Sequence, residues 1–168
     1  MEKIGFGGSC LWCTEAIFQS LKGVDKVEQG WISSSHLIKD FSEGVIIQFD
    51  HVQIDVQTLI SIHLYTHSCT ANHSMRSKYR SAIYSFSKKQ TELSKAAISS
   101  LQSDFNVPIV TKVHPFGSFK TNHKTYLDYY FKQPNNPFCE TYINPKLKLL
   151  MKRFSNRVDR EKLKHLEV

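Results

Sequence analysis

The chain of 168 residues is 40% hydrophobic and 22% charged, and its formal net charge is +7. This length can bury one substantial core, so we predict a single domain over residues 1–168. No apolar run approaches the ~18 residues of a membrane helix, so we expect no membrane association. Lys and Arg gather from Lys146 to Lys164 among acidic residues. Because no binding motif accompanies them, the charge favours a solvated helix face and no nucleic-acid partner.

The first residues, Met1 to Ile4, run directly into a predicted strand without the apolar region of a signal peptide. We therefore expect the protein to be cytoplasmic. The four cysteines would be reduced there, and would serve catalysis or metal binding rather than structural disulfides. No assembly signature is present, so we expect a monomer.

The elements of the first half follow from hydrophobic periodicity and from turn residues. The clearest strand is Val45 to Phe49, where apolar residues alternate, and Asp55 is placed to cap the next helix. The predicted order is a strand at 4–6, a helix at 14–21 that ends near Gly23, strands at 24–31 and 45–49, a helix at 56–62 and a strand at 79–86.

In the second half, Ser87–Gln90 forms a capping box before a long helix. Asn144 and Pro145 give the N-cap and the first residue of the last helix, whose apolar face continues to Val158. Between these helices we predict a short strand at 109–113 and a helix at 121–132.

The order β-α-β-β-α-β in the first half is that of the ferredoxin-like split βαβ unit. We therefore predict an α+β fold with a ferredoxin-like βαββαβ two-layer core. The C-terminal half would extend this core with a helix, an edge strand and a helical or irregular tail.

Cys10 lies where an apolar strand passes through Gly7 and Gly8 into a helical pattern. Unpaired N–H groups at a helix start stabilise the thiolate, which is the nucleophilic form of cysteine. Cys10 and Cys13 also form C-x-x-C, whose sulfur atoms lie one helical turn apart and can exchange disulfides. Cys13 is alternatively a small buried residue. Trp12 places an apolar plate beside the thiol, which suits an uncharged substrate group.

Two more residues carry candidate chemistry. Glu43 precedes an apolar run, where a closed pocket would favour a protonated carboxyl that can donate a proton. The residues alone favour a solvent-facing loop glutamate instead. Cys139 follows Pro137 and Phe138 in an irregular stretch. A thiol there could travel to an oxidised partner or stay inert and half-buried.

Cys69, His63, His67 and His73 provide zinc-type ligands in one short stretch, but their spacing matches no closed Cys/His set. We therefore expect a polar loop without a metal, and no cofactor. A reactive thiol near a histidine is also typical of cysteine hydrolases, but no pattern identifies which histidine would serve.

Ser9 to Glu15 reads Ser-Cys-Leu-Trp-Cys-Thr-Glu. It resembles the G-C-F-W-G-x-E signature of the A-type peptide methionine sulfoxide reductases. The similarity covers about residues 4–154, and the family's βαββαβ core agrees with the predicted fold. Further matches follow in order at Leu21–Val24, Gly30–Trp31, Glu43–Asp50, His67–Thr70 (family H-D-P-T), Tyr79–Tyr84 (family Y-R-S-x-I-Y), Asn122–Leu127, and Phe138–Cys139 before Ile143–Leu147.

The resemblance implies reduction of the S epimer of methionine sulfoxide, protein-bound or free, to methionine. It implies that the Cys10 thiolate attacks the sulfoxide sulfur. Glu43 would protonate the departing oxygen and Tyr79 would hydrogen-bond it. Leu11 and Trp12 would hold the S-methyl group.

The resemblance also implies how Cys10 is restored. Cys139 would condense with the Cys10 sulfenic acid to form a disulfide, and thioredoxin or a similar dithiol would reduce that disulfide. Cys13 replaces a glycine of the family, so it is a possible alternative resolving residue.

Other departures concern the residues that hold the substrate. Leu11 replaces Phe, Ser68 and Cys69 replace Asp and Pro, and Ser74 stands in place of the family's substrate-anchoring Asp. The loop between residues 31 and 43 lacks the family's tyrosine, a second donor to the sulfoxide oxygen. Losing one preorganised donor typically reduces the rate about 10²–10³-fold. We predict a weaker enzyme or one with a shifted substrate.

Two other functions stay open on the sequence. The missing tyrosine and aspartate are compatible with a non-catalytic relative that binds a methionine-like ligand. The pair Cys10 and Cys13 is compatible with a dithiol oxidoreductase, although the βαββαβ order argues against a thioredoxin fold.

Overall fold

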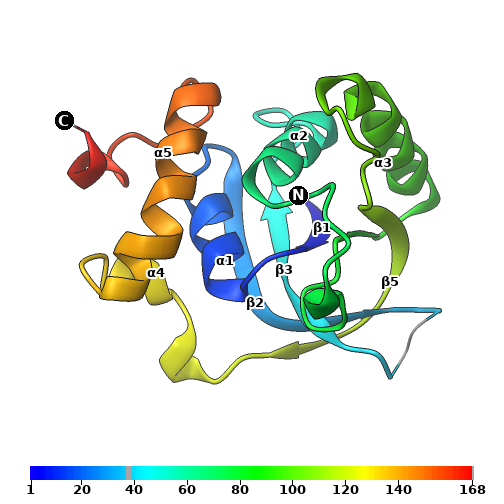
Figure 1. Ribbon diagram of the computed structural model, residues 1–168, viewed down its shortest axis with the longest axis horizontal. Helices are drawn as coiled ribbons and strands as arrows, with labels where there is room; N and C mark the ends of the chain where they lie inside the picture. Colours follow the sequence, from blue (N-terminus) through cyan, green and yellow to red (C-terminus); the bar gives the residue numbers. More distant parts are fainter. Residues whose placement is uncertain (37–38, 168) are drawn as a thin grey trace.

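The computed structural model describes residues 1–36 and 39–167. Within these ranges, five strands form one sheet and the helices pack around it (Figure 1). The strands are β1 (Glu2–Gly7), β2 (Val24–Ser34), β3 (Ser42–Phe49), β4 (Ala82–Ser85) and β5 (Lys112–Thr121). The α-helices are α1 (Leu11–Gln19), α2 (Val56–Thr66), α3 (Lys88–Leu101), α4 (Tyr129–Lys132) and α5 (Asn144–Arg153). Short 3-10 or π turns are η1 (Ser74–Ser77), η2 (Gln102–Asp104), η3 (Lys124–Tyr126), η4 (Cys139–Ile143) and η5 (Lys164–Leu166).

The sheet follows the order β1–β3–β2–β5–β4 and closes into a barrel, because β1 also pairs with β4. All neighbouring strands are antiparallel except β4 and β5, which are parallel. In Figure 1, α1, α4 and α5 lie on the left of the sheet, whereas α2 and α3 lie at the upper right. The fold is therefore mixed α/β with a five-stranded sheet.

The sheet is apolar on both faces. Val45, Ile47 and Phe49 of β3 belong to the main core together with residues of α1 and α2. Successive side chains of a strand point to opposite faces, so Ile46 faces the other side, inside the barrel. It belongs to a smaller buried cluster of Ile32, Ile46, Ala82 and Tyr84.

Strand β5 corrects the prediction of a short edge strand at 109–113. It runs from Lys112 to Thr121 and pairs with both β2 and β4, so it is not an edge. Pro115 and Gly117 concealed this strand in the sequence because both residue types are rare in strand interiors. Gly117 is required by close packing, since a Cβ there would lie 2.4 Å from the carbonyl carbon of Ser34 on β2.

The helix predicted at 121–132 is wrong in extent, because only η3 and α4 form there. Asp128 separates them with a φ of 55°, a left-handed conformation that interrupts a right-handed helix. The last helix begins at Asn144, one residue before the predicted start at Pro145, and Ile143 rather than Asn144 is its N-cap. It ends at Arg153 instead of continuing to Val158.

Two predicted caps are confirmed. The Asp55 carboxylate accepts from the Thr58 N–H at 2.8 Å, and the Ser87 hydroxyl accepts from the Gln90 N–H at 3.1 Å. Helix α1 starts at Leu11, three residues earlier than predicted, which makes Cys10 its N-cap. Among the described residues, no helix is long and apolar enough to cross a membrane.

Candidate active site

Cys10 is placed by a tight connection between β1 and α1. Gly8 has a φ of 147°, and a Cβ there would lie 2.5 Å from the His67 ring, so this turn requires glycine. Cys10 then caps α1, with its carbonyl accepting from the Thr14 N–H at 3.1 Å. The thiol is therefore positioned at the positive end of the α1 dipole, as the sequence predicts.

The pKa of Cys10 is lowered from 9.0 to about 7. The largest cause is a hydrogen bond from the Cys13 thiol, and the backbone N–H groups of Trp12 and Cys13 add to it. Partial burial and the charge of Glu43 act in the opposite direction. A substantial fraction of Cys10 is consequently thiolate near neutral pH.

Cys13 is buried, with 3% of its surface exposed. Its hydrogen bond to Cys10, followed by burial, raises its pKa, whereas the charge of Lys146 lowers it. The Lys146 ammonium donates to the Thr66 carbonyl at 2.6 Å. Cys13 therefore acts as a protonated donor while Cys10 is a thiolate.

Glu43 is buried at the start of β3 and is only 7% exposed. The solvent-facing loop glutamate that the residues alone favoured is therefore wrong. Its Oε1 accepts from the Leu11 N–H at 3.2 Å, and its Oε2 lies 3.6 Å from the Lys78 Nζ. The carboxyl is thereby positioned at the same helix start as the Cys10 thiol.

Tyr79 is half-buried, and Arg76 fixes the chain around it. The Arg76 Nη1 donates to the carbonyls of Gly8 and Tyr79 at 2.9 Å each, and its Nη2 donates to the Ser68 carbonyl at 2.6 Å. One guanidinium thus ties the segment around η1 to the turn before Cys10.

These residues surround an open pocket of about 490 Å³, called the Glu43 pocket below. Trp12 forms an aromatic wall, because its ring stacks on Tyr129 with centroids 3.9 Å apart and meets the Phe138 edge at 5.5 Å. The lining residues are Cys10, Leu11, Trp12, Trp31, Glu43, Lys78, Tyr79, Asn122, Tyr126 and Phe138.

Five of the predicted residues therefore meet in the Glu43 pocket. The five other lining residues were missed as site residues: Trp31, Lys78, Asn122, Tyr126 and Phe138. Lys78 precedes the Y-R-S motif, and Trp31 pairs across the sheet with Glu43. The pairing of β2 with β3 was the signal that could have placed Trp31 there.

A second open pocket of about 380 Å³, called the Lys146 pocket below, shares Cys10, Tyr79 and Phe138 with the Glu43 pocket. Cys10, Cys13 and Tyr79 line it together with Lys146 and Phe138. Ser74 is exposed at the start of η1 and lines neither pocket, although its neighbours His73 and Met75 line the Lys146 pocket. Residues 37 and 38 of the loop that lacks the family's tyrosine lie outside the described ranges.

Cys139 is completely buried in the π turn η4, and burial raises its pKa. It lines neither pocket, whereas Cys10 and Cys13 share the Lys146 pocket. All four cysteines are free thiols. Cys13 can therefore meet an oxidised Cys10 in place, and Cys139 is close enough to Cys13 for its charge to raise the Cys13 pKa.

The two buried histidines among the four zinc-type side chains weighed in the sequence, His63 and His67, are engaged in hydrogen bonds. The His63 Nε2 bonds to the Gly7 carbonyl at 2.8 Å, and the His67 Nδ1 bonds to the His63 carbonyl at 2.6 Å. The remaining His67 nitrogen bonds to the Ser81 hydroxyl at 2.8 Å. The described residues contain no group of three or more His, Cys, Asp or Glu side chains that could hold a metal ion.

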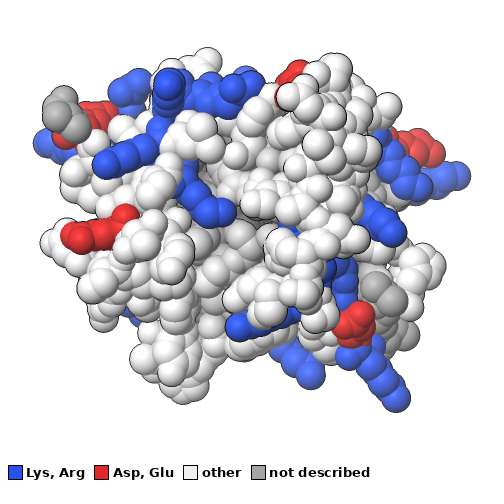
Figure 2. Space-filling model, viewed as in Figure 1, with Lys and Arg blue, Asp and Glu red and all other residues white. Residues whose placement is uncertain are grey.

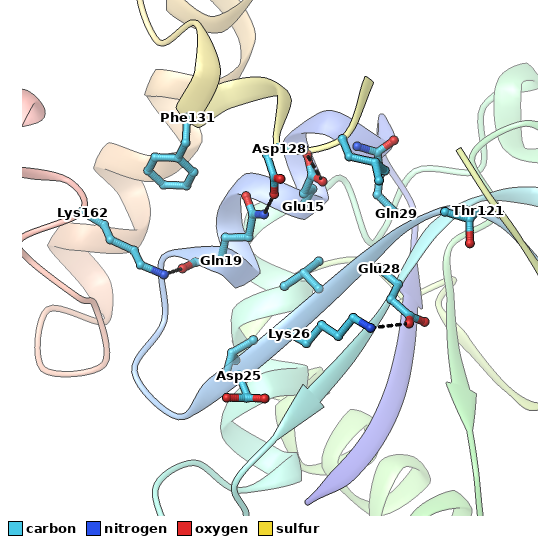
Figure 3. A pocket seen from close by; sticks show the side chains of 13 residues that line it. Glu15, Gln19, Asp25, Lys26, Glu28, Gln29, Thr121, Asp128, Phe131 and Lys162 are labelled. Carbon is cyan, nitrogen blue, oxygen red and sulfur yellow. Dashed lines mark hydrogen bonds and ion pairs between the residues drawn. The ribbon is translucent and has the colours of Figure 1, made fainter. Parts of the chain in front are cut away.

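A larger pocket of about 780 Å³ lies between α1, β2 and α4 and contains none of the predicted site residues (Figure 3). The buried Glu15 faces it and accepts from the backbone N–H groups of Asp128 at 3.0 Å and Tyr129 at 3.2 Å. Through Tyr129, this carboxylate supports the ring that stacks on Trp12.

Figure 2 shows how the charged side chains are distributed over one face of the molecule. Lys and Arg side chains gather along the upper edge over α5, and a hollow near the centre has mostly uncharged walls. One pocket is thus lined by a cysteine with a lowered pKa, a buried carboxyl and a tyrosine. This combination defines an enzyme that uses a thiolate as its nucleophile.

Comparison with known proteins is more specific. The sequence model of the family described as Peptide methionine sulfoxide reductase matches residues 2–158. The Peptide methionine sulfoxide reductase MsrA of a Psychrobacter species is 33% identical over 170 residues, covering 92% of this chain and 97% of that protein. The chain therefore belongs to the peptide methionine sulfoxide reductase family.

Solved structures share the fold. Mxr1 from Saccharomyces cerevisiae in its reduced form has a TM-score of 0.70 at 17% identity, over 84% of this chain and 90% of that one. Mxr1 in complex with Trx2 has a TM-score of 0.59 at 16% identity, over 73% and 81% of the two chains.

Proposed function

We propose that this chain reduces the S epimer of methionine sulfoxide, free or in a protein, to methionine. The observation that carries the proposal is the Cys10 thiol, with a pKa of about 7, in one pocket with Glu43, Tyr79 and Trp12. Membership of the family supplies the sulfoxide as the target.

The chemistry follows from the positions of these groups. The Cys10 thiolate attacks the sulfoxide sulfur, and Glu43 delivers the proton that the oxygen needs. Tyr79 donates a hydrogen bond to that oxygen, while Leu11 and Trp12 contact the S-methyl group. The hydroxyl then moves to the Cys10 sulfur as its bond to the substrate sulfur and the new bond between the two sulfur atoms break, which leaves a Cys10 sulfenic acid and methionine.

The sulfenic acid is then resolved by a thiol. Cys139 condenses with Cys10, one water leaves, and a disulfide remains. Because Cys139 is fully buried, this step requires η4 to open. Cys13, which already contacts Cys10, is the alternative resolving residue. Thioredoxin is proposed as the reductant, a choice that the solved complex of Mxr1 with Trx2 supports.

An assay with both epimers of a methionine sulfoxide peptide and dithiothreitol tests the reductase function. We expect turnover of the S epimer by the wild type and none by Cys10→Ser. Cys69→Ser is the matched control, because Cys69 is a buried free thiol that lines neither pocket. A folded, reduced wild type without S-epimer turnover would sink the proposal.

A second candidate function, a dithiol oxidoreductase, is favoured by the hydrogen bond between Cys10 and Cys13. Peptide mapping after one equivalent of oxidant separates the two. A bridge between Cys10 and Cys139 supports the reductase route, whereas a bridge between Cys10 and Cys13, with disulfide exchange but no sulfoxide turnover, supports the alternative.

We also propose a ferredoxin-like arrangement for the first six elements. The antiparallel order β4–β1–β3–β2 supports it, with β5 as the added strand that closes the sheet. A monomer in the cytoplasm remains our proposal, and size-exclusion chromatography and localisation of the tagged protein test its two parts.

A further inference from the structure

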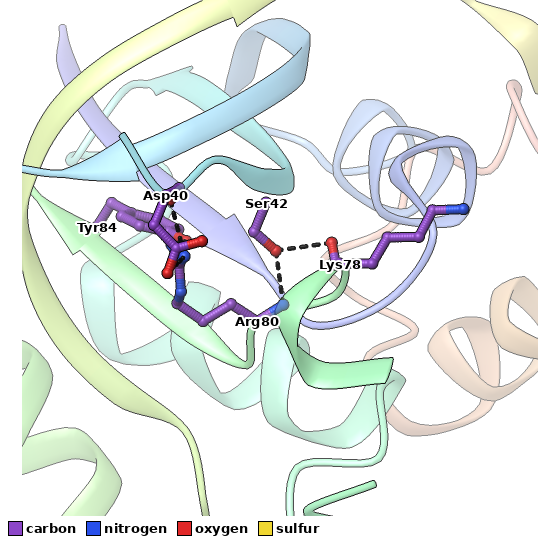
Figure 4. Close-up of polar contacts among 5 residues, drawn as sticks. All are labelled: Asp40, Ser42, Lys78, Arg80 and Tyr84. Carbon is purple, nitrogen blue, oxygen red and sulfur yellow. Dashed lines mark hydrogen bonds and ion pairs between the residues drawn. The ribbon is translucent and has the colours of Figure 1, made fainter. Parts of the chain in front are cut away.

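Lys78 is held at the edge of the Glu43 pocket by its own backbone. Its carbonyl accepts hydrogen bonds from the Glu43 N–H at 2.9 Å and the Ser42 hydroxyl at 2.7 Å. The Ser42 oxygen also accepts from the Arg80 N–H at 2.7 Å, and Arg80 pairs with Asp40 at 3.0 Å. Figure 4 shows the Lys78 side chain extending away from this network. The backbone is thus fixed, and the Lys78 side chain forms part of the lining of the Glu43 pocket.

The Lys78 ammonium contacts both residues that we assign to the sulfoxide oxygen. Its Nζ lies 3.6 Å from the Glu43 Oε2 and 5.2 Å from the centroid of the Tyr79 ring. A hydrogen bond with Tyr79, followed by the charge of Glu43, raises the pKa of Lys78. The ammonium therefore stays charged at the pH at which Cys10 becomes a thiolate.

The reaction needs such a charge at this place. When Cys10 attacks the sulfoxide sulfur, a bond forms between the two sulfur atoms and an electron pair moves towards the oxygen. A preorganised donor at that oxygen stabilises the transition state. Tyr79 is one donor, and residues 32–42 contain no tyrosine to act as a second. Among the described residues that line the Glu43 pocket, only Lys78 has a positively charged Lys or Arg side chain.

We propose that the Lys78 ammonium is a catalytic residue that donates a hydrogen bond to the sulfoxide oxygen and stabilises its developing negative charge. This role rests on the proposed reductase function. Lys78 keeps its own proton, and the Glu43 carboxyl supplies the proton that the oxygen takes up. The products are the Cys10 sulfenic acid and methionine, so atoms and electrons balance without another reactant.

A purely structural ion pair between Lys78 and Glu43 predicts a different result. Exposed ion pairs are usually worth little, and the Lys78 side chain is 55% exposed. If Lys78 only paired with Glu43, Lys78→Gln would leave sulfoxide reduction nearly unchanged.

The experiment is a single turnover of an S-epimer methionine sulfoxide peptide without added reductant, with the methionine formed as the readout. We expect Lys78→Gln to lower the rate about 10²-fold, the loss typical of one oxyanion donor. Lys78→Arg keeps a charged donor and should retain most of the rate. Lys120→Gln is the matched control, because it removes the same charge opposite Trp31 on β5 but outside the pocket lining.

Alkylation of Cys10 by iodoacetamide provides the second readout, because this reagent has no oxygen for Lys78 to stabilise. We expect Lys78→Gln to be alkylated as fast as the wild type. The proposal is overturned if Lys78→Gln reduces the sulfoxide as fast as the wild type or faster. It is also overturned if Lys78→Gln slows alkylation as much as reduction, or if Lys120→Gln slows reduction as much as Lys78→Gln does. A wild type without turnover overturns the reductase function itself, whereas an active wild type with an equally active Lys78→Gln overturns only the role of Lys78.

Discussion

The Cys10 thiolate depends on one neighbouring thiol more than on any other group. The Cys13 hydrogen bond is the largest cause of the lowered Cys10 pKa. We therefore predict that Cys13→Ala raises the pKa of Cys10 and decreases its thiolate fraction at pH 7. A shift of one pKa unit corresponds to about a tenfold decrease where the thiol form dominates. The pH dependence of Cys10 alkylation, followed by mass spectrometry of its peptide, measures the shift.

Cys69→Ala is the control for this measurement, because it removes another buried thiol away from the two pockets. Its alkylation profile at Cys10 should match that of the wild type. An unchanged profile in Cys13→Ala would mean that the helix N–H groups alone stabilise the thiolate.

The sequence predicts the residues of the site unevenly. Cys10 could be found because a glycine turn before a helix is a local pattern. The burial of Glu43 could not, because it depends on the pairing with Trp31 across the sheet and on the approach of the Leu11 N–H. Lys78 was missed for the same reason, since its contact with Glu43 exists only after β3 and the chain before β4 meet.

At the scale of elements, Glu15 connects α1 to the segment that carries the aromatic wall. It is 1% exposed and accepts two backbone N–H groups, and burial is the main cause of its raised pKa. We predict that Glu15→Gln lowers the free energy of unfolding by about 1–3 kcal/mol at pH 4.5, because one buried acceptor is lost.

The pH dependence of this difference has a defined sign. A carboxyl whose pKa is raised in the folded state stabilises the protein fully below its unfolded pKa, and the contribution fades as pH rises through the folded pKa. The difference between wild type and Glu15→Gln should therefore shrink as pH rises from 4.5 towards neutrality. Urea unfolding across this range measures it, with the half-exposed Glu28→Gln as control. A difference that grows with pH contradicts the raised pKa.

The π turn η4 has to change if Cys139 resolves the sulfenic acid. Cys139 and Ile143 are both completely buried in the reduced form. We predict that oxidation to the Cys10–Cys139 disulfide increases amide hydrogen exchange over 139–143. Oxidised Cys139→Ser should not show this increase. A Cys10–Cys139 bridge that forms with unchanged exchange would show that the thiols meet without opening η4.

The caps Asp55 and Ser87 could be predicted from the sequence because they act through residues three positions away. The helix expected at 121–132 failed because its interruption is set by distant partners. The Asp128 N–H donates to the Glu15 carboxylate, and the Asp128 carboxylate accepts from the Gln19 amide. Together these bonds hold Asp128 in its left-handed conformation. Hydrophobic periodicity does not contain that information.

At the scale of the molecule, the order of elements was predictable and the closure of the sheet was not. Strand β5 makes contacts with β2 and β4, which are far from it in the sequence. Its composition is poor for a strand, and its close approach to β2 depends on Gly117 and Gly30. A Cβ at Gly30 would lie 2.1 Å from the Lys120 carbonyl oxygen. Closure is therefore decided by packing between distant backbones.

The same packing buries a pair of histidines between β1 and α2. The rings of His63 and His67 stack with centroids 4.1 Å apart. Carbonyl oxygens only accept, so the His63 Nε2 donates to Gly7 and the His67 Nδ1 donates to the His63 carbonyl. Burial lowers the pKa of both rings, and the charges of Arg76 and Lys146 add to the effect at His67. Both histidines are neutral in the folded protein at pH 7.

This pair makes the molecule sensitive to acid. The pKa of His67 falls from 6.5 to about 4 on folding. A lowered folded pKa means that stability is present above the unfolded pKa and is lost as pH falls towards the folded pKa. Between pH 6.5 and 4, we predict that His67 alone decreases the free energy of unfolding by about 3 kcal/mol.

Urea unfolding at intervals between pH 7 and 4 tests this prediction in the wild type and His67→Gln. The variant keeps a neutral donor and acceptor but loses the imidazole ring, so we expect it to be less stable than the wild type at pH 7. Its free energy of unfolding should fall less steeply on acidification, with a pH slope smaller by up to the contribution of one proton. His51→Gln is the control, because the His51 side chain is 62% exposed and pairs only with Glu2 among the ion pairs of the described residues. If His67→Gln follows the wild-type slope, the buried ring is protonated without penalty, and the acid sensitivity must originate at other groups, such as His63.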